Sequence, residues 1–147
     1  MNITHSIIIK NLDNVEEMLQ AFPLTQQLYP AMNLATFRAN ISEMVAMNNF
    51  KMVAAFYNDK LVGVSGYWVS RMLYCGRYLQ VSNFVVDKNI RSHGIGRKIL
   101  HYLESLAHEF KCDKFVLDSY TENKKSHPFY FGEGFYVRGF HFMKDIK

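Results

Sequence analysis

The chain has 147 residues, of which 49% are hydrophobic and 20% charged, and its formal net charge is +4. This length and composition predict one soluble globular domain over residues 1–147. No apolar run approaches the length of a membrane-spanning helix, and the basic residues are too scattered for the charged patch typical of nucleic-acid-binding proteins. We therefore expect no membrane and no nucleic-acid partner.

The N-terminal segment and the two cysteines bear on where the protein is located and whether it binds a metal. The chain opens without a basic segment followed by a long apolar stretch, so the sequence shows no secretory signal and a cytoplasmic protein is expected. Cys75 and Cys112 are the two cysteines and form no metal-type cluster. They are predicted to be free thiols, and no metal site is expected.

The first third of the chain is predicted to form one strand and two helices. A short apolar strand covers 6–10, and Asp13 is expected to cap a helix that ends near Pro23. Residues 24–33 are predicted to be a loop because they contain a second proline. Apolar residues at helical spacing then predict a helix over 34–48.

The rest of the chain alternates strands with helices. Strands are predicted over 51–57 and 61–70, joined by a hairpin turn, and over 79–86. The later elements are predicted as a helix over 95–110, a strand over 114–119, a short helix over 123–133 and a last strand over 135–144. The strand over 114–119 is expected to pair in parallel with the strand over 79–86, because the helix between them supplies the crossover. The order indicates a mixed α/β sheet.

The turn between the strand over 79–86 and the next helix carries two glycines, Gly94 and Gly96. Glycine lets the backbone turn sharply and leaves it unobstructed by side chains. The first amides of a helix have no intrahelical partner and lie at the positive end of its dipole. This turn is therefore predicted to bind a phosphate group.

The glycine spacing separates three kinds of phosphate ligand. A P-loop requires Gly-Lys-Ser/Thr after four residues, and this chain lacks it. A dinucleotide fingerprint requires a third glycine where Ile99 stands, although Asp118 at the end of the next strand keeps a small nucleotide-binding domain as an alternative.

The pattern that remains is Arg91-x-x-Gly94-x-Gly96 after a strand ending at 84–86. It resembles the acetyl-coenzyme A pyrophosphate loop of the GCN5-related N-acetyltransferases (GNAT family). The downstream block 123–135, NKKSHPFYFGEGF, resembles the next motif of that family. The resemblance implies an α/β fold in which a mixed, mostly antiparallel central sheet is splayed at a parallel pair and flanked by helices.

The resemblance also implies an activity and a site. The expected function is transfer of an acetyl group from acetyl-CoA to a primary amine by direct attack in a ternary complex. Tyr130 matches the family tyrosine that lies near the coenzyme A sulfur and often acts as general acid. The residues that the resemblance assigns to acetyl-CoA binding are Phe84, Val85, Val86, Arg91, Ser92, His93, Gly94, Ile95, Gly96, Arg97, Asn123, Ser126, Phe129 and Tyr130.

A general base is not evident in the sequence. Many GNAT enzymes carry an acidic residue on the strand before the loop, where this chain has Gln80, Ser82 and Asn83. Asp118, Glu122 and His127 remain as candidates, and a water chain or an amine that arrives neutral would also serve. The missing carboxylate keeps open a non-catalytic acyl-CoA-binding sensor or regulatory module of the same fold.

The acceptor is predicted only in outline. In GNAT-like folds the early helices shape the acceptor side, and residues 26–30 hold that position here. A small-molecule amine and a peptide amine both remain possible acceptors, and the chain is expected to be a monomer or a homodimer.

Overall fold

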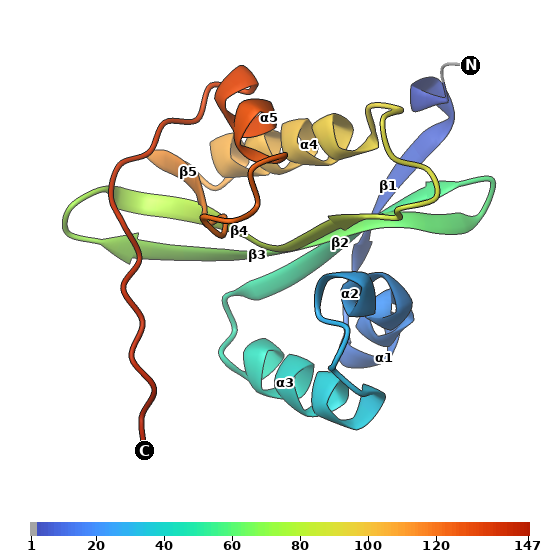
Figure 1. The fold of residues 1–147 in the computed structure, drawn as a ribbon, viewed down its shortest axis with the longest axis horizontal. Helices are drawn as coiled ribbons and strands as arrows, with labels where there is room; N and C mark the ends of the chain where they lie inside the picture. The colour runs from blue at the N-terminus through green and yellow to red at the C-terminus, as the bar shows by residue number, and fades with distance from the viewer. Residues whose placement is uncertain (1–2) are drawn as a thin grey trace.

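The computed structural model describes residues 3–147, and a five-stranded sheet runs through it (Figure 1). Along the sheet the strands are β1 (Ile7–Leu12), β2 (Phe50–Tyr57), β3 (Lys60–Met72), β4 (Gly76–Val86) and β5 (Lys114–Leu117). Neighbouring strands from β1 to β4 are antiparallel, whereas β4 and β5 are parallel. This arrangement confirms the mixed sheet with one parallel pair that the sequence predicts.

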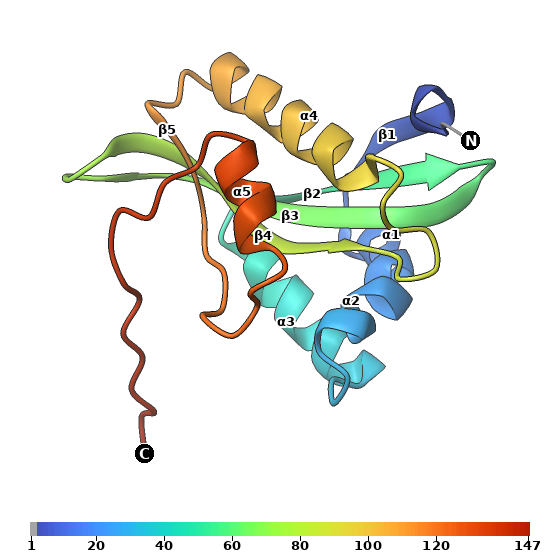
Figure 2. The ribbon, with the colours of Figure 1, turned by 45° about the horizontal axis from the view of Figure 1, so that its top comes forward.

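Helices cover both faces of the sheet (Figures 1 and 2). The helices α1 (Val15–Met18), α2 (Phe22–Leu28) and α3 (Leu34–Ala46) lie on one face, and α4 (Ile95–Glu109) and α5 (His127–Gly132) lie on the other. Short 3₁₀ helices precede β1 (Thr4–Ser6) and α2 (Leu19–Ala21). Each face has its own buried apolar cluster. Within residues 3–147 no helix is both long and apolar enough to cross a membrane.

The first helices begin at different residues from those predicted. Asn14 caps α1 by accepting from the Glu17 amide at 2.9 Å, while the Glu17 carboxylate accepts from the Asp13 amide at 2.7 Å. This reciprocal cap lies one residue after the predicted one. Pro23 sits in the first turn of α2, where its missing N–H costs nothing, so it opens a helix instead of ending one. The prediction of a loop over 24–33 is therefore wrong for residues 24–28, which belong to α2.

An irregularity interrupts β4 near its centre. Gly66 of β3 pairs with Ser82, but Val64 pairs with Val85, so β4 contains one extra residue between the two pairs. Asn83 lies in this interval with a φ of 54°, in the left-handed region that asparagine tolerates better than most residues. The extra residue makes this a β-bulge, which bends the strand and reverses the face of the sheet on which the following side chains lie.

The bulge shifts which residues of β4 face α4. Before it, Leu79 and Val81 belong to the core under α4. After it, Phe84 and Val86 pack against that same core, so the alternation has moved by one residue. The aromatic ring of Phe84 is thereby turned toward the helix that follows the glycine turn.

The last two predicted elements differ from the structure. The short helix begins at His127 instead of residue 123, because the chain before it makes turns such as the bond from the Asn123 amide to the Tyr120 carbonyl at 3.0 Å. The strand predicted over 135–144 does not form, and 135–147 has no regular structure. A strand needs a neighbour to satisfy its backbone, and Figures 1 and 2 show this segment leaving the sheet.

Candidate functional site

The glycine turn presents free backbone amides at the start of α4. Gly94 is the N-cap residue with a φ of 77°, and Ser92 two residues earlier has a φ of 70°. The first amide bonded back within the helix is that of Lys98, which donates to the Gly94 carbonyl at 3.0 Å. The amides of residues 95–97 therefore have no intrahelical partner, and they point out of the positive end of a 15-residue helix. This geometry suits an anion.

Hydrogen bonds from a distant part of the chain hold this turn in place. Asp87, only 6% exposed, accepts from the Asn89 amide at 3.1 Å and from Gln27 Nε2 at 3.3 Å. Gln27 Oε1 accepts in turn from the Lys88 amide at 3.0 Å. The hydrogen bond from Asn89 is the main cause that lowers the pKa of the Asp87 carboxyl. Asp87 is thus an ionised turn residue that fastens α2 to the loop.

Gly96 brings three predicted site elements together. A Cβ built on Gly96 would lie 3.2 Å from Phe84 Cζ, 3.6 Å from Val86 Cγ2 and 3.9 Å from Phe129 Cζ. These atoms belong to β4 and α5, so the first turn of α4 touches both. A side chain at this position would be in tight contact with the Phe84 ring, which would have to shift by a few tenths of an ångström.

The sheet opens beside this turn. β5 pairs with β4 only between Tyr78 and Val81, and β4 then continues to Val86 without a partner on that side among residues 3–147. The predicted contacts at 84–86 lie on this unpaired stretch, directly after the bulge. Arg91 Nε donates to the Val86 carbonyl at 3.2 Å, which leaves the other backbone groups facing the opening available to a ligand.

Tyr130 lies on α5 beside Phe129, the residue that approaches Gly96. Its ring is half-buried between Phe129, with centroids 5.5 Å apart, and Phe135, at 6.0 Å in an edge-on contact. Burial raises the pKa of the Tyr130 hydroxyl, so the phenol stays protonated and able to donate at neutral pH. Within residues 3–147 the hydroxyl has no hydrogen-bond partner. The side chain is therefore a free donor with a fixed ring.

The end of α5 explains how that ring is fixed. Gly134 has a φ of 93°. Its amide donates to the Phe131 carbonyl at 3.1 Å, and the Phe135 amide donates to the Tyr130 carbonyl at 3.0 Å. These two bonds and the Phe135–Tyr130 contact make a Schellman motif, which glycine favours. The Gly134-Phe135 pair singled out in the sequence thus orients Tyr130.

Other predicted site residues are engaged elsewhere or exposed. Arg97 Nε pairs with Glu133 at 3.1 Å, and Glu133 also contacts His101 Nε2 at 2.7 Å, so Arg97 links α4 to α5. Asn123 is exposed in the turn before α5, and Ser126 is the N-cap residue without a side-chain cap bond. His127 Nε2 bonds the Tyr120 carbonyl at 3.0 Å and thereby holds the loop after β5.

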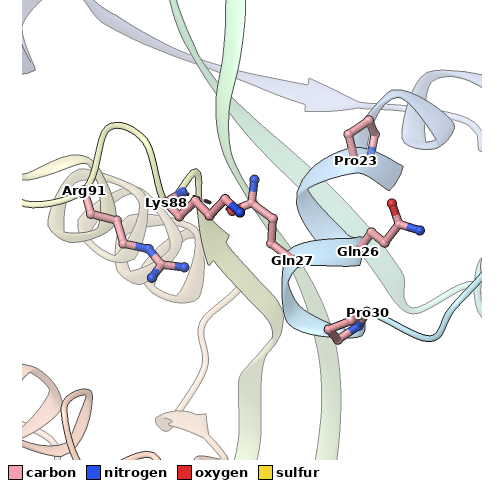
Figure 3. A pocket seen from close by; sticks show the side chains of 6 residues that line it. All are labelled: Pro23, Gln26, Gln27, Pro30, Lys88 and Arg91. Atoms are coloured by element: carbon pink, nitrogen blue, oxygen red, sulfur yellow. Dashed lines mark hydrogen bonds between the residues drawn. The ribbon is translucent and has the colours of Figure 1, made fainter.

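A cavity of about 410 Å³ lies between α2 and the turn (Figure 3). Its lining is Pro23, Gln26, Gln27, Pro30, Lys88 and Arg91. Next to it Tyr29 Oη donates to Asn83 Oδ1 at 3.2 Å, and burial with the nearby Tyr120 raises the pKa of Tyr29. The sequence named the 26–30 region, but it carried no signal for the contact between Tyr29 and the bulge residue Asn83.

A family comparison decides the affiliation of this fold and site. The model of the Acetyltransferase (GNAT) family matches residues 14–135, which is most of the chain. The chain belongs to the GNAT family. The resemblance based on the glycine turn and the block at 123–135 is thereby confirmed.

Individual relatives of this GNAT protein are distant in sequence. The uncharacterized N-acetyltransferase YhdJ of Bacillus subtilis (strain 168) is 23% identical over 141 residues, covering 95% of this chain and 99% of the relative. The fold matches aminoglycoside N-acetyltransferase AAC(6')-Iy in complex with CoA, with a TM-score of 0.80, 16% identity and 95% of both chains covered. It also matches aminoglycoside acetyltransferase meta-AAC0020 from an uncultured soil metagenomic sample, in complex with sisomicin, with a TM-score of 0.79, 18% identity and 99% of both chains covered.

The GNAT site has no carboxylate on the unpaired part of β4. Asp118 follows β5, accepts from Gln80 Nε2 at 3.0 Å and lies 3.6 Å from His141 Nδ1. Glu122 is exposed and bonded by Thr121 at 3.3 Å. No group of three or more His, Cys, Asp or Glu side chains in residues 3–147 is arranged to hold a metal ion.

Proposed function

We propose that this GNAT protein transfers an acetyl group from acetyl-CoA to a primary amine. The observation that carries the proposal is the junction of two backbone features, the free amides of residues 95–97 and the unpaired edge of β4 after the bulge at Asn83. The first fits a diphosphate and the second fits an extended amide-bearing arm. Gly94 allows the left-handed backbone of the turn, and Gly96 lets the first turn of α4 approach Phe84 closely.

The chain would hold coenzyme A mainly through its backbone. The amides of 95–97 would bind the diphosphate oxygens, with Arg91 adding positive charge beside them. The unpaired groups of β4 at 84–86 would bind the pantetheine amides in the manner of an added strand. A β4 amide placed at the thioester carbonyl would stabilise the negative charge that develops on that oxygen. Acetyl-CoA itself supplies the acetyl group as an activated thioester.

Tyr130 is proposed to serve the leaving sulfur. Its raised pKa keeps the proton on the phenol at neutral pH, and its ring is held by Phe129 and Phe135. A positioned acid of this kind gives its proton, or a strong hydrogen bond, to the thiolate as the carbon–sulfur bond breaks. We assign no general base, because Asp87 is committed to the turn and β4 offers no carboxylate.

The acceptor amine is proposed to enter from the α2 side, next to Tyr29 and Asn83. These side chains meet at the bulge, where α2 lies against the opening in the sheet. A small-molecule amine is favoured because two of the matching folds are those of aminoglycoside acetyltransferases. The N-acetyltransferase YhdJ supports amine acetylation in general.

A screen for acceptors tests this proposal. Purified protein with acetyl-CoA is presented with polyamines, aminoglycosides, amino sugars, amino acids and peptides, and free thiol is measured together with the mass of the product. We expect thiol release that depends on one acceptor class and a product heavier by one acetyl group. Tight binding of acetyl-CoA without thiol release for any amine would instead support the acyl-CoA sensor.

A further inference from the structure

Two cationic side chains without an acidic partner line the cavity between α2 and the turn after β4 (Figure 3). Among residues 3–147, neither Lys88 nor Arg91 takes part in an ion pair, and the ammonium group of Lys88 has no hydrogen-bond partner. The other lining residues are uncharged, namely Pro23, Gln26, Gln27 and Pro30. The cavity therefore carries positive charge that no side chain lining it neutralises.

The carboxylate of Asp87 lies next to the cavity, but its hydrogen bonds commit it to the turn. Asp87 is only 6% exposed, is not a lining residue, and accepts from the Asn89 amide and from Gln27 Nε2. Lys60 as well as Lys88 helps to lower the pKa of its carboxyl, so a third cation lies nearby. One buried carboxylate thus stands against three cationic side chains, which leaves the electrostatic potential at the cavity positive.

The cavity has room for the polar end of a small molecule. Its volume of about 410 Å³ lies within the range of about 300–1,000 Å³ that small-molecule sites have. Pro23 and Pro30 give it walls whose backbone the proline rings restrict. The backbone path from Val85 to Lys88 spans at most roughly 10 Å. One small molecule is therefore long enough to reach from the stretch of β4 proposed to hold the thioester to the cavity.

We propose that the acceptor is a small amine that also carries a phosphate or a carboxylate, and that Lys88 and Arg91 bind this anionic group in the cavity. The inference rests on the acetyltransferase function proposed above and narrows its acceptor class. An anion would pair with two cations that have no ion-pair partner among residues 3–147. A polycationic amine would place positive charge against them, and no carboxylate lines the cavity to bind it. Anionic amines are thus favoured over polyamines and aminoglycosides.

Coenzyme A has phosphates of its own, and Lys88 distinguishes the two ligands. The proposed diphosphate site is the backbone of residues 95–97, with Arg91 beside it. Lys88 has no part in that site, and its amide donates to Gln27 Oε1 of α2, on the acceptor side. Arg91 would therefore be shared by the two ligands, whereas Lys88 would serve the acceptor alone. A change at Lys88 tests the inference without disturbing the diphosphate site.

Matched acceptors give the first test, on the wild-type protein. Glucosamine 6-phosphate differs from glucosamine by the phosphate alone, and glycylglycine differs from glycylglycine amide by one carboxylate. We expect kcat/KM to be about tenfold or more higher for the anionic member of a pair, and this advantage to shrink as added salt screens the charges. The two pairs also show which anion the cavity takes. Equal or higher kcat/KM for the neutral members, or for spermidine, would overturn the inference.

A variant places the effect at the cavity. Lys88→Gln should raise KM for the anionic acceptor about tenfold and leave the affinity for acetyl-CoA unchanged. Lys51→Gln is the matched control, because Lys51 is an exposed lysine near the start of β2, at the other end of the sheet, and should change neither. An unchanged acceptor KM in Lys88→Gln would contradict the inference. So would weaker binding of coenzyme A with unchanged binding of dephospho-coenzyme A, because the cavity would then hold a phosphate of the cosubstrate.

Binding measured without turnover separates this inference from the proposed function. With coenzyme A bound, calorimetric titration should show that the anionic member of a matched pair binds more tightly than its neutral counterpart, and that Lys88→Gln removes the difference. If this preference is found while no amine is acetylated, the transferase function is contradicted and the anion site stands. If amines are acetylated and the anionic members bind no more tightly, the anion site is contradicted and the function stands.

Discussion

The two faces of the sheet are built differently. On one face the 15-residue helix α4 buries Ile95, Ile99 and Leu103 almost completely and begins at the glycine turn, with α5 beside it. On the other, three helices of 4, 7 and 13 residues cover the sheet, and α2 reaches β4 through side-chain bonds such as Tyr29 to Asn83. In the function that we propose, the α4 face would supply rigid backbone for the cosubstrate, and the α1–α3 face would supply side chains for the acceptor.

The largest effect is expected at the α4 turn. Gly94→Val forces a branched residue to a φ of 77° and misdirects the amides of residues 95–97. Loss of roughly 3 kcal/mol of charge-assisted hydrogen bonding corresponds to about a 100-fold loss of acetyl-CoA affinity. Calorimetric titration measures it. Gly76→Val is the control, since a φ of 79° at the start of β4 imposes similar strain away from the proposed site. Equal affinity losses in the two variants would show that the turn has no special role.

Tyr130 on the same face should affect turnover and leave binding unchanged. Tyr130→Phe removes the hydroxyl and keeps the ring contacts with Phe129 and Phe135. An interaction made only in the transition state appears in kcat. Because general acid catalysis contributes a factor of about 100 to 10,000, we expect kcat to fall by at least about tenfold when chemistry limits the rate. Single-turnover measurements with the true acceptor are required. Wild-type rates in this variant would make Tyr130 a packing residue.

The buried core under α4 contains Tyr67, whose ionisation makes stability depend on pH. Burial is the main cause that raises the pKa of Tyr67 from 10.0 to about 12. Between these values the folded state binds the proton more tightly than the unfolded state, so this stabilisation is full below pH 10 and is lost as pH rises toward 12. The free energy of unfolding, measured with denaturant, should fall by on the order of 2 kcal/mol over this pH range, and Tyr67→Phe should abolish the fall. Tyr136→Phe, in the exposed segment after α5, should leave this fall unchanged. A wild-type free energy of unfolding that stays constant from pH 10 to 12 contradicts the burial argument.

The smallest effect is expected on the acceptor face. Tyr29→Phe removes one hydrogen bond to Asn83, which is worth about 0.5–1.5 kcal/mol, so KM for the acceptor should rise by a factor of about two to ten. Affinity for acetyl-CoA should not change. Tyr74→Phe, 70% exposed in the β3–β4 turn, is the matched control. A change in acetyl-CoA affinity without a change in acceptor KM would show that Tyr29 contributes to acetyl-CoA binding and not to acceptor binding.

The sequence predicted the α4 face well because its signals are local. The spacing of Gly94 and Gly96 and the Gly134-Phe135 pair each fix a backbone conformation within a few residues. The other face depended on choices that are not local. Pro23 is compatible with the end of a helix and with its first turn, and only the packing of α2 on β4 decides between them.

Two further features were beyond the sequence for the same reason. The bulge at Asn83 is defined by the register with β3, which a single strand does not reveal. The segment predicted as a strand over 135–144 has a suitable apolar pattern, yet among the described residues 3–147 it pairs with no strand. A pattern of alternation predicts the capacity to form a strand and leaves the identity of its neighbour open.

The central claim is that acetyl-CoA binds at the junction of the turn and the unpaired edge of β4, and amide-resolved NMR tests it most directly. On titration with coenzyme A, we predict the largest shifts for the amides of 84–86 and 95–97, with small shifts in α3 (Leu34–Ala46). Unchanged spectra at saturating ligand, or shifts concentrated on the α1–α3 face, would contradict the account.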